Sequence, residues 1–296
     1  MITIVTVDYN GLADTCALLQ CFTPYFKDDG KGMIGTWRAE MIVVDNGSDA
    51  DEASQIARRF PWAKTIRSDA NYGYAAACNM GLMSAKGSYV MLLNNDTLLD
   101  PEELPQLALR LDSDDKIGIV CPKLRYASGD RLIQYAGYTP LSSVTLRNHA
   151  IGMGKPDDGS YDDPCPTPFA HGAAMMVRRS AVDVAGMMPE CYFLYYEELD
   201  WSLMMRRKGF AVWYEPACTV FHKESQSTGA QSPLHTYYLT RNRLLFAHRN
   251  VPPFSRPLSY AYLVMIVAVR DVALHLLHRR GDLAKATLRG VAAFFK

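Results

Sequence analysis

The chain has 296 residues, 49% of them hydrophobic, and its 31 basic residues balance 31 acidic ones. Zero net charge argues against a protein that coats nucleic acid, which needs a basic excess, and the apolar content argues against disorder as the main state. The seven scattered cysteines include no C-x-x-C pair. They therefore predict neither a disulfide framework nor a zinc site, and they indicate a reducing, cytoplasmic compartment.

Strand-like apolar runs alternate with helix-like segments through the first 121 residues. We expect buried strands at residues 2–7, 41–44, 65–67, 89–93 and 117–121. Helices are expected at residues 11–26, at 49–60, in the Ala-rich stretch that ends near Gly87, and after Asp100-Pro101-Glu102. This alternation predicts an α/β fold with a mainly parallel central sheet flanked by helices on both faces.

The rest of the chain is less regular. Residues 122–168 are rich in Gly, Pro, Ser and Asp and predict an irregular excursion with one or two hairpins. Strands at 173–177 and 210–214 enclose a helix at 197–208, and the chain is expected to be helical from 257 to 295. No uninterrupted apolar run reaches the roughly 20 residues that a membrane-spanning helix needs. The expectation is therefore that the chain does not cross a bilayer.

Polar residues follow three of the predicted strands, where ligands bind in open parallel sheets. They are Asp8-Tyr9-Asn10-Gly11, Asp45-Asn46-Gly47-Ser48-Asp49 and Asn94-Asn95-Asp96. The first of these turns lacks the G-x-G-x-x-G pattern of dinucleotide-binding folds, and the chain has no P-loop motif. Both oxidoreductases of that type and P-loop NTPases are therefore disfavoured.

A series of motifs in a fixed order carries a family resemblance. They are residues 5–10 (Val-Thr-Val-Asp-Tyr-Asn), 43–48 (Val-Val-Asp-Asn-Gly-Ser), 71–74 with 79–81, 93–97 (Leu-Asn-Asn-Asp-Thr), 171–175, 196–201 (Tyr-Glu-Glu-Leu-Asp-Trp), Pro216 with His222, and Tyr237-Tyr238 with Arg241-Asn242. Together they resemble the family 2 glycosyltransferases of the GT-A (nucleotide-diphospho-sugar transferase) fold, particularly the non-processive rhamnosyltransferase-like branch. The resemblance predicts a glycosyltransferase domain over residues 1–250 and a C-terminal amphipathic helical extension over 251–296.

The resemblance implies a site for a nucleotide-sugar donor. The acid at position 45 would bind the nucleobase in a pocket that Thr6 and Asn10 line, although a simple turn with a helix cap also accounts for Asp45 to Asp49. The other residues implied in donor binding are Ser48, Asn71, Gly73, Asn94, Asn95, Gly172, Ala173 and Arg241. Arg241 is expected, with Lys223, Ser225 and Ser227, to belong to a loop that folds over the diphosphate.

The resemblance also implies a divalent cation. Asp96 stands at the last acid of the family's D-x-D motif, and His222 at the histidine that completes the metal shell. The first acid of the motif is replaced here by Asn94, which lowers the negative charge of the site. A hard cation with oxygen ligands suits a diphosphate, so Mg²⁺ is expected, and the imidazole makes Mn²⁺ an alternative.

Glu197-Glu198-Leu199-Asp200 matches the family's E-D-x-D catalytic segment, with Glu198 at the usual aspartate. Glu198 is therefore the expected general base of an inverting transfer. Glu197, Asp200 and Trp201 are the expected acceptor-binding residues. For Asp200 an ion pair with Arg206 is an alternative, and for Trp201 the alternatives of a core residue and a sugar platform stay open.

From Arg270 onward the chain has six basic and two acidic residues among apolar ones. This basic amphipathic pattern over 257–296 predicts contact with an anionic membrane, and the alternatives are a homodimer interface or a cover for the sheet. The expected location is cytoplasmic, at the inner face of the cytoplasmic membrane.

The resemblance further implies a dTDP- or UDP-sugar donor and a glycan or lipid-linked glycan acceptor in surface polysaccharide synthesis. The Q-x-x-R-W motif of processive members is absent from the sequence, which favours addition of a single sugar. Two other functions stay open: a non-catalytic sugar-nucleotide-binding or scaffold protein with the same fold, and a nucleotidyltransferase.

Overall fold

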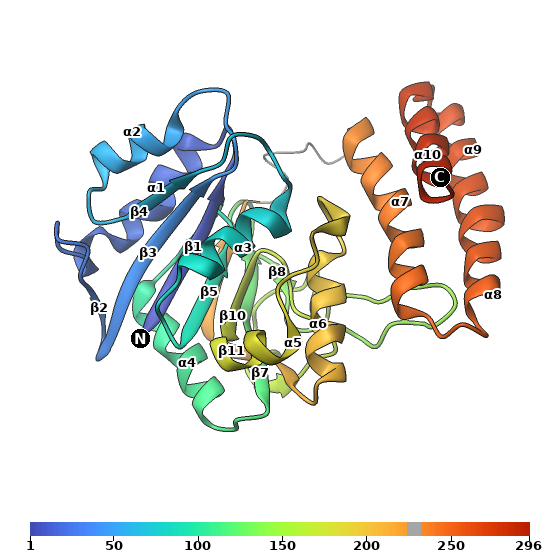
Figure 1. Ribbon diagram of the computed structural model, residues 1–296. Coiled ribbons are helices and arrows are strands. Elements are labelled where there is room, and N and C mark those ends of the chain that lie inside the picture. Colours follow the sequence, from blue (N-terminus) through green and yellow to red (C-terminus); the bar gives the residue numbers. More distant parts are fainter. Residues whose placement is uncertain (224–231) are drawn as a thin grey trace.

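The computed structural model describes residues 1–223 and 232–296. Figure 1 shows a twisted sheet with helices on both of its faces, and beside it a unit made of the C-terminal helices. Ser225 and Ser227, which the sequence places in a loop over the diphosphate, lie outside the described residues.

One mixed sheet forms the centre of the molecule. Its strands are β1 (Ile2–Asp8), β2 (Gly32–Ile34), β3 (Trp37–Asp45), β4 (Lys64–Arg67), β5 (Tyr89–Leu93), β6 (Thr97–Leu99), β7 (Ile117–Tyr126), β8 (Ile133–Tyr135), β9 (Cys165–Pro166), β10 (Ala174–Arg178) and β11 (Ala211–His222). The main order is β2-β3-β1-β5-β10-β7-β11-β6. Strands β4, β3, β1 and β5 are parallel, and β10 runs antiparallel to both of its neighbours. The predicted α/β class with helices on both faces of the sheet is confirmed (Figure 1). The sheet is mixed and not mainly parallel, because β10, β2, β6, β8 and β9 pair antiparallel with their neighbours.

Among the described residues, six helices cover the sheet: α1 (Leu12–Phe22), α2 (Glu52–Arg59), α3 (Tyr74–Ser84), α4 (Leu104–Asp112), α5 (Arg179–Ala185) and α6 (Glu197–Arg207). The Ala-rich α3 packs closely on β1, because a Cβ atom at Gly81 would lie 2.2 Å from Cγ1 of Val5. All five residues of β5 are buried, as are six of the seven in β1. These continuous apolar runs are typical of strands covered on both faces.

Strands β3, β7 and β11 are longer than the sequence indicates, and β3 begins at Trp37, four residues before the expected start at residue 41. β7 continues through Pro122 to Tyr126. The strand tolerates Pro122, which has no N–H to donate, because its neighbour β10 pairs only with Ile119 and Val120 and does not reach the proline. β11 runs on to His222 and pairs antiparallel with β6, which places His222 opposite Thr97. The short elements β2, β6 and α5 were not predicted, and neither was the 18-residue helix α7 (Pro233–Asn250), which lies before the predicted helical region that starts at 257.

The C-terminal unit consists of α7 (Pro233–Asn250), α8 (Arg256–Ala261), a π-helical stretch (Tyr262–Ala268), α9 (Val269–Leu277) and α10 (Gly281–Phe294). α7 packs along α10, and the irregular segment after β8 reaches this unit, where the Ser259 hydroxyl donates to the carbonyl of Val144. The predicted helical C-terminus is confirmed. The division into residues 1–250 and 251–296 stays a prediction.

The expectation that no segment has the length and composition of a membrane-spanning helix is wrong. Arg256–Leu277 forms 22 consecutive helical residues that meet both criteria, and only 17% of the most apolar window is buried. Arg270 and Asp271 do not interrupt this helix, because their side chains pair with each other on its surface. Length and composition alone do not show that it enters a bilayer.

Candidate functional site

A cavity of about 380 Å³ opens at the carboxyl ends of β1, β3 and β5. Six of the residues expected in donor and metal binding line it: Asn71, Gly73, Asn94, Asn95, Asp96 and His222. Tyr9, Tyr74, Gln134, His171, Tyr195 and His235 complete much of its wall. The motifs that the sequence spreads over some 150 residues are therefore brought to one place.

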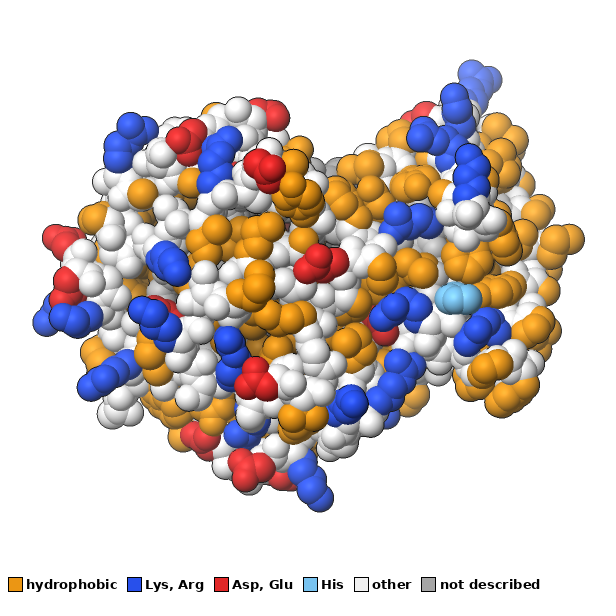
Figure 2. Space-filling model, viewed as in Figure 1, with side chains coloured by type: hydrophobic (Ala, Val, Ile, Leu, Met, Phe, Trp, Pro, Cys, Tyr) orange, Lys and Arg blue, Asp and Glu red, His pale blue; other side chains and the backbone are white. Residues whose placement is uncertain are grey.

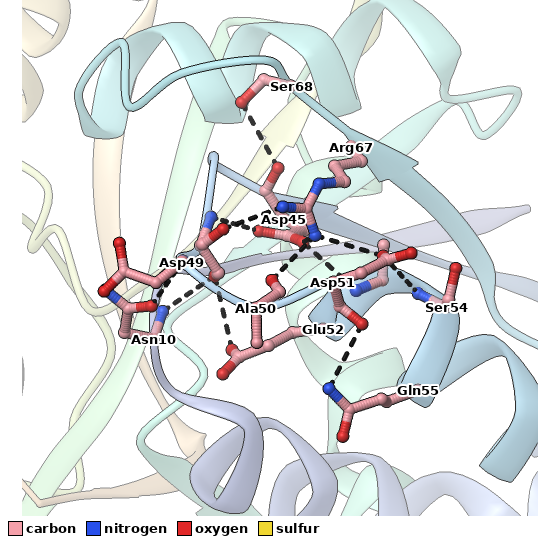
Figure 3. Close-up of polar contacts among 12 residues, drawn as sticks. Asn10, Asp45, Asp49, Ala50, Asp51, Glu52, Ser54, Gln55, Arg67 and Ser68 are labelled. Carbon is pink, nitrogen blue, oxygen red and sulfur yellow. Dashed lines mark hydrogen bonds and ion pairs between the residues drawn. The ribbon is translucent and has the colours of Figure 1, made fainter.

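Asp45 is not in this wall, because its carboxylate is fully buried in its own turn (Figure 3). Oδ1 accepts from the backbone N–H of Ser48 at 2.8 Å, and Oδ2 accepts from Ala53 N at 3.2 Å and from Arg67 Nη1 at 2.9 Å. The helix cap itself is Asp51, whose side chain accepts from Ser54 N. The simple turn interpretation therefore fits the geometry, and Asp45 shapes the turn without a free oxygen for a nucleobase.

Asn10 and Ser48 join the loops that follow β1 and β3. Asn10 N donates to Ser48 Oγ at 2.9 Å, and Asn10 Oδ1 accepts from Asp49 N at 2.9 Å (Figure 3). The left-handed backbone of Asn10, at φ 52°, is one that asparagine adopts more readily than most residues. Thr6 lies fully buried in β1. These residues support the rim of the cavity without lining it.

Asp96 and His222 face each other in the cavity. Oδ1 of Asp96 is buried, accepts no hydrogen bond from the described residues, and lies 3.3 Å from Nε2 of His222. Nδ1 of His222 lies 3.0 Å from Oε1 of Gln134. With Nδ1 donating to this amide oxygen, the lone pair of Nε2 faces Asp96, as in a histidine that is oriented for metal binding.

A bare carboxylate oxygen beside an oriented imidazole fits a divalent cation with two protein ligands. No group of three or more His, Cys, Asp or Glu side chains with metal-binding geometry occurs in residues 1–223 and 232–296. Amide oxygens and a bound diphosphate would have to supply the remaining ligands. Asn94 offers one, since its buried Oδ1 also has no hydrogen-bond partner among the described residues.

The backbone around Asn94 and Asn95 is held firmly. Asn94 N donates to the carbonyl of Ala173 at 2.9 Å, and Asn95 Nδ2 donates to Thr15 Oγ1 at 2.9 Å and to Asp8 Oδ1 at 3.3 Å. Burial raises the pKa of Asp8 to about 7. Ala173 thus acts through its backbone, and the side chain of Asn95 is committed to the end of β1 and the first turn of α1.

Glu198 lies next to the cavity, behind Gly172. A Cβ atom at Gly172 would be 3.7 Å from the Glu198 carboxyl carbon, and the Gly172 carbonyl accepts from the hydroxyl of Tyr74 at 2.8 Å. Burial raises the pKa of Glu198 to about 7 and that of its neighbour Glu197 to about 8. A carboxyl group with a pKa near neutrality can accept a proton and release it again at physiological pH.

A strained turn delivers Glu198 to this position. Phe193, Tyr195 and Tyr196 have φ between 69° and 79°, which is unfavourable for aromatic residues. The Asn242 amide on α7 holds the turn by donating to the carbonyls of residues 192, 194 and 195 at 2.9, 2.6 and 3.1 Å. Gly73 supports it from the other side, since a Cβ atom there would lie 2.3 Å from the Phe193 oxygen.

Arg241 does not reach the cavity, contrary to the expectation for donor binding. Its Nη2 donates to the carbonyls of Cys191 and Tyr192, both at 2.8 Å, so it holds the same turn as Asn242. Lys223 likewise forms an ion pair with Asp14. Both cations are engaged within the protein, and the sequence pattern does not show these internal partners.

Two of the expected acceptor-binding residues belong to the core. Trp201 is fully buried and its Nε1 donates to the carbonyl of Gly186 at 2.9 Å, which fits the core alternative. Asp200 is also fully buried and pairs with Arg249 and the Tyr192 hydroxyl, and not with Arg206. Residues 200 and 201 follow the base on the inner face of α6, where a helix must pack against the sheet.

Sequence reasoning missed Gln134, Tyr74, His171 and Asn242. Gln134 comes from the irregular excursion, and a lone glutamine there carries no periodic signal. His171 stacks on Tyr138, with ring planes 5° apart. Tyr74, His171 and Asn242 all stand in motifs that carry the resemblance, but only the fold shows their contacts, such as that of Asn242 with the turn before α6.

The model of "Glycosyl transferase family 2" matches residues 36–185. The low-salt glycan biosynthesis hexosyltransferase Agl10 of Haloferax volcanii is 26% identical over 70% of this chain and 66% of its own length. The N-acetylglucosaminyl-diphospho-decaprenol L-rhamnosyltransferase of Mycobacterium tuberculosis is 24% identical over 66% of this chain and 70% of its own. The chain thus spans about two thirds of these relatives.

Two solved structures share the fold. GalNAc-T7 with UDP, GalNAc and Mn²⁺ has a TM-score of 0.62 at 14% identity, covering 93% of this chain and 57% of its own. The mannosyltransferase PcManGT from Pyrobaculum calidifontis with GDP-Man and Mn²⁺ has a TM-score of 0.58 at 14% identity, covering 99% and 86%. At this identity the likeness establishes a shared fold.

Proposed function

We propose that this chain, which belongs to glycosyltransferase family 2, is an inverting, metal-dependent enzyme that moves one sugar from a nucleotide-diphosphate donor to a glycan or lipid-linked glycan acceptor. The observation that carries the proposal is the pair of Asp96 and His222, where a buried carboxylate oxygen without a donor faces an oriented imidazole. Such a site suits a cation that neutralises the leaving diphosphate.

The donor would lie in the cavity at the strand ends. Asp96 and His222 would hold Mn²⁺ or Mg²⁺, and the cation would bind the diphosphate oxygens and stabilise their negative charge. Asn94, Asn71 and Tyr9 line the same cavity and provide polar contacts for the nucleoside and sugar. We keep both dTDP and UDP as candidate carriers, since the wall contains no feature that selects between them.

Glu198 is the proposed general base. Its carboxylate takes the proton from an acceptor hydroxyl as the hydroxyl oxygen attacks the anomeric carbon. The bond from that carbon to the diphosphate oxygen breaks on the opposite face, so the configuration inverts and the nucleoside diphosphate leaves with the bonding electron pair. The strained turn held by Asn242 would keep the carboxylate in place for this attack.

The reaction is proposed to occur on the cytoplasmic face of a membrane. Leu258, Met265, Ile266, Val269 and Leu277 are each more than half exposed on the outer face of the 256–277 helix. Figure 2 shows hydrophobic side chains gathered over this unit, with Lys and Arg side chains at its upper end. An apolar face beside basic residues suits an interfacial helix on anionic lipid. A second copy of the chain is the competing occupant.

The decisive assay measures release of nucleoside diphosphate from a panel of dTDP- and UDP-sugars, with and without acceptor, in Mn²⁺, Mg²⁺ or chelator. Asp96→Ala should abolish metal-stimulated turnover and weaken metal-dependent binding of the nucleoside diphosphate. Asp115→Ala, at a fully exposed aspartate, is the matched control and should change neither. Unchanged metal-dependent nucleotide binding by Asp96→Ala would refute the metal assignment.

Flotation with anionic vesicles tests the membrane contact separately. Ile266→Glu on the outer face should abolish co-flotation. Sedimentation that shows a dimer broken by this substitution, with no binding to vesicles, would assign the face to a second copy instead.

A further inference from the structure

A second cavity, of about 610 Å³, lies within the C-terminal unit, outside the donor site. Its walls are one face of α7, the π-helical stretch, α9 and the beginning of α10. The volume is in the range of about 300–1,000 Å³ that is typical of small-ligand sites. The family model ends at residue 185, so this cavity belongs to a part of the chain that the match does not cover.

The lining combines a long apolar surface with basic groups. Its apolar side chains are Leu239, Leu244, Leu263, Val267, Leu274 and Leu283. Two cationic side chains, Arg243 and Arg280, and three histidines also line the cavity. Its wall contains one acidic residue among those described, Asp271. A ligand that matches such a wall has an apolar chain and a negatively charged group.

Arg243 is the lining residue best placed to bind an anion. Asp271 is already paired with Arg270, and Arg280 with Asp282. The guanidinium of Arg243 donates through Nε to the hydroxyl of Tyr196 at 2.9 Å and has no carboxylate within 4 Å among the described residues. Asp271 acts on this guanidinium electrostatically but forms no direct ion pair with it. A partly buried guanidinium whose donors are not taken up by a carboxylate favours binding of phosphate or carboxylate.

The two cavities adjoin. His235, near the start of α7, lines both of them. Figure 1 shows α7 standing between the sheet domain and the remaining C-terminal helices. A molecule in the second cavity could therefore present its far end to the donor site. The π-helical stretch supplies Leu263, Val267 and Ala268 to the wall, and π-helical turns occur frequently at functional sites.

We propose that this cavity binds the lipid-phosphate part of the acceptor, with an isoprenoid-type chain against the apolar wall and a phosphate on Arg243. The proposal rests on the proposed function, because it assigns the acceptor to the lipid-linked class. It also explains why the 256–277 helix is apolar on two faces, one exposed and one lining the cavity.

The test measures binding of farnesyl phosphate, farnesol and inorganic phosphate to the full chain by calorimetry, below micelle-forming concentrations. Farnesyl phosphate should bind at least about tenfold more tightly than either half-ligand, since it alone has both features. Arg243→Met should remove that advantage and leave farnesol binding unchanged. Equal affinity for farnesyl phosphate and farnesol, or for farnesyl phosphate and inorganic phosphate, would overturn the proposal.

Two neighbouring residues provide a matched steric control. Val267 is 6% exposed and lines the cavity, whereas Ile266 is 57% exposed on the outer face. Val267→Trp should abolish farnesyl phosphate binding, and Ile266→Trp should leave it intact; the reverse pattern would move the lipid to the outer face. Retained nucleoside-diphosphate binding shows that each variant is folded, and Ala268→Leu replaces Val267→Trp if that variant fails this check.

Failure of this inference differs from failure of the proposed function. Transfer to a lipid-free glycan as efficient as transfer to the same glycan on a lipid phosphate would refute the cavity assignment and leave the transferase intact. Binding of farnesyl phosphate with the predicted variant pattern, but no transfer from any donor, would do the opposite.

Discussion

Glu198 should give the enzyme a pH profile that its substitution removes. Burial raises the pKa of this carboxyl to about 7, and a general base works only when ionised. At about pH 6 roughly one-eleventh of the molecules would have an ionised base, against roughly ten-elevenths at about pH 8, so kcat/KM should rise about tenfold between them. Glu198→Gln should lose about 10²–10⁴-fold in kcat and the acidic limb of the profile.

Glu197→Gln is the matched control, since the neighbouring residue has the same carboxyl side chain but is more deeply buried. Burial raises its pKa to about 8, so it is still protonated while Glu198 ionises, and the acidic limb should stay near pH 7 in this variant. The assay is nucleoside-diphosphate release at saturating donor from pH 5.5 to 8.5. A Glu198→Gln enzyme with full turnover, or a Glu197→Gln enzyme that alone loses the limb, would refute the assignment.

The same pKa shift predicts a change in stability. Folding raises the pKa of Glu198 above its usual value, so the folded state binds the proton more tightly than the unfolded state. Its contribution to the free energy of unfolding is therefore full below about pH 4.5 and is lost as the pH rises through about 7. Denaturant unfolding of wild type and Glu198→Gln should show a smaller loss of stability over this range in the variant, and equal losses would contradict the shift.

Three further substitutions test the supporting residues. Gln134→Leu should weaken Mn²⁺ binding about 10–100-fold, because the His222 ring loses its orienting partner, and titration calorimetry with nucleoside diphosphate measures it; unchanged affinity would remove Gln134 from the site. Asn242→Leu should lower kcat more than it raises donor KM, because the turn before Glu198 relaxes, and equal changes in both would indicate a general structural effect. Trp201→Ala should cost about 3–5 kcal/mol in denaturant unfolding, as for a buried aromatic residue, whereas a loss of acceptor binding without loss of stability would restore the sugar-platform role.

Much of the sheet was predictable because its strands are buried on both faces. Continuous β-branched and apolar runs, as in 2–7 and 89–93, are strong local signals and both became strands. Apart from the 18-residue helix α7, the elements that the sequence missed are short or depend on a partner. β6 consists of residues 97–99 and exists by pairing with the end of β11, and that pairing joins residues more than 120 positions apart. No local pattern contains such information.

Site residues were predictable where the end of a strand determines their position. They were less predictable where the side chain has several possible hydrogen-bond partners. Asp96 and His222 meet because β6 and β11 are paired, and both were expected. Asp45 and Arg241 occupy the expected positions in the motifs, but their side chains are satisfied by Arg67 and by backbone carbonyls, respectively. A motif fixes where a residue lies along the chain, whereas competing internal partners decide where its polar atoms point.

Helix α7 connects the two proposed halves of the reaction. Asn242 holds the turn that positions Glu198, and the next residue, Arg243, donates to Tyr196 in that same turn while it lines the lipid cavity. A phosphate bound by Arg243 would therefore contact a residue only one peptide bond away from the support of the base. Binding of a lipid phosphate to Arg243 should then affect the position of Glu198, because Arg243 and Asn242 both contact the strained turn that precedes Glu198. Farnesyl phosphate should accordingly shift the acidic limb of donor turnover in wild type and not in Arg243→Met, and an identical profile with and without the lipid would show that α7 supports the two sites independently.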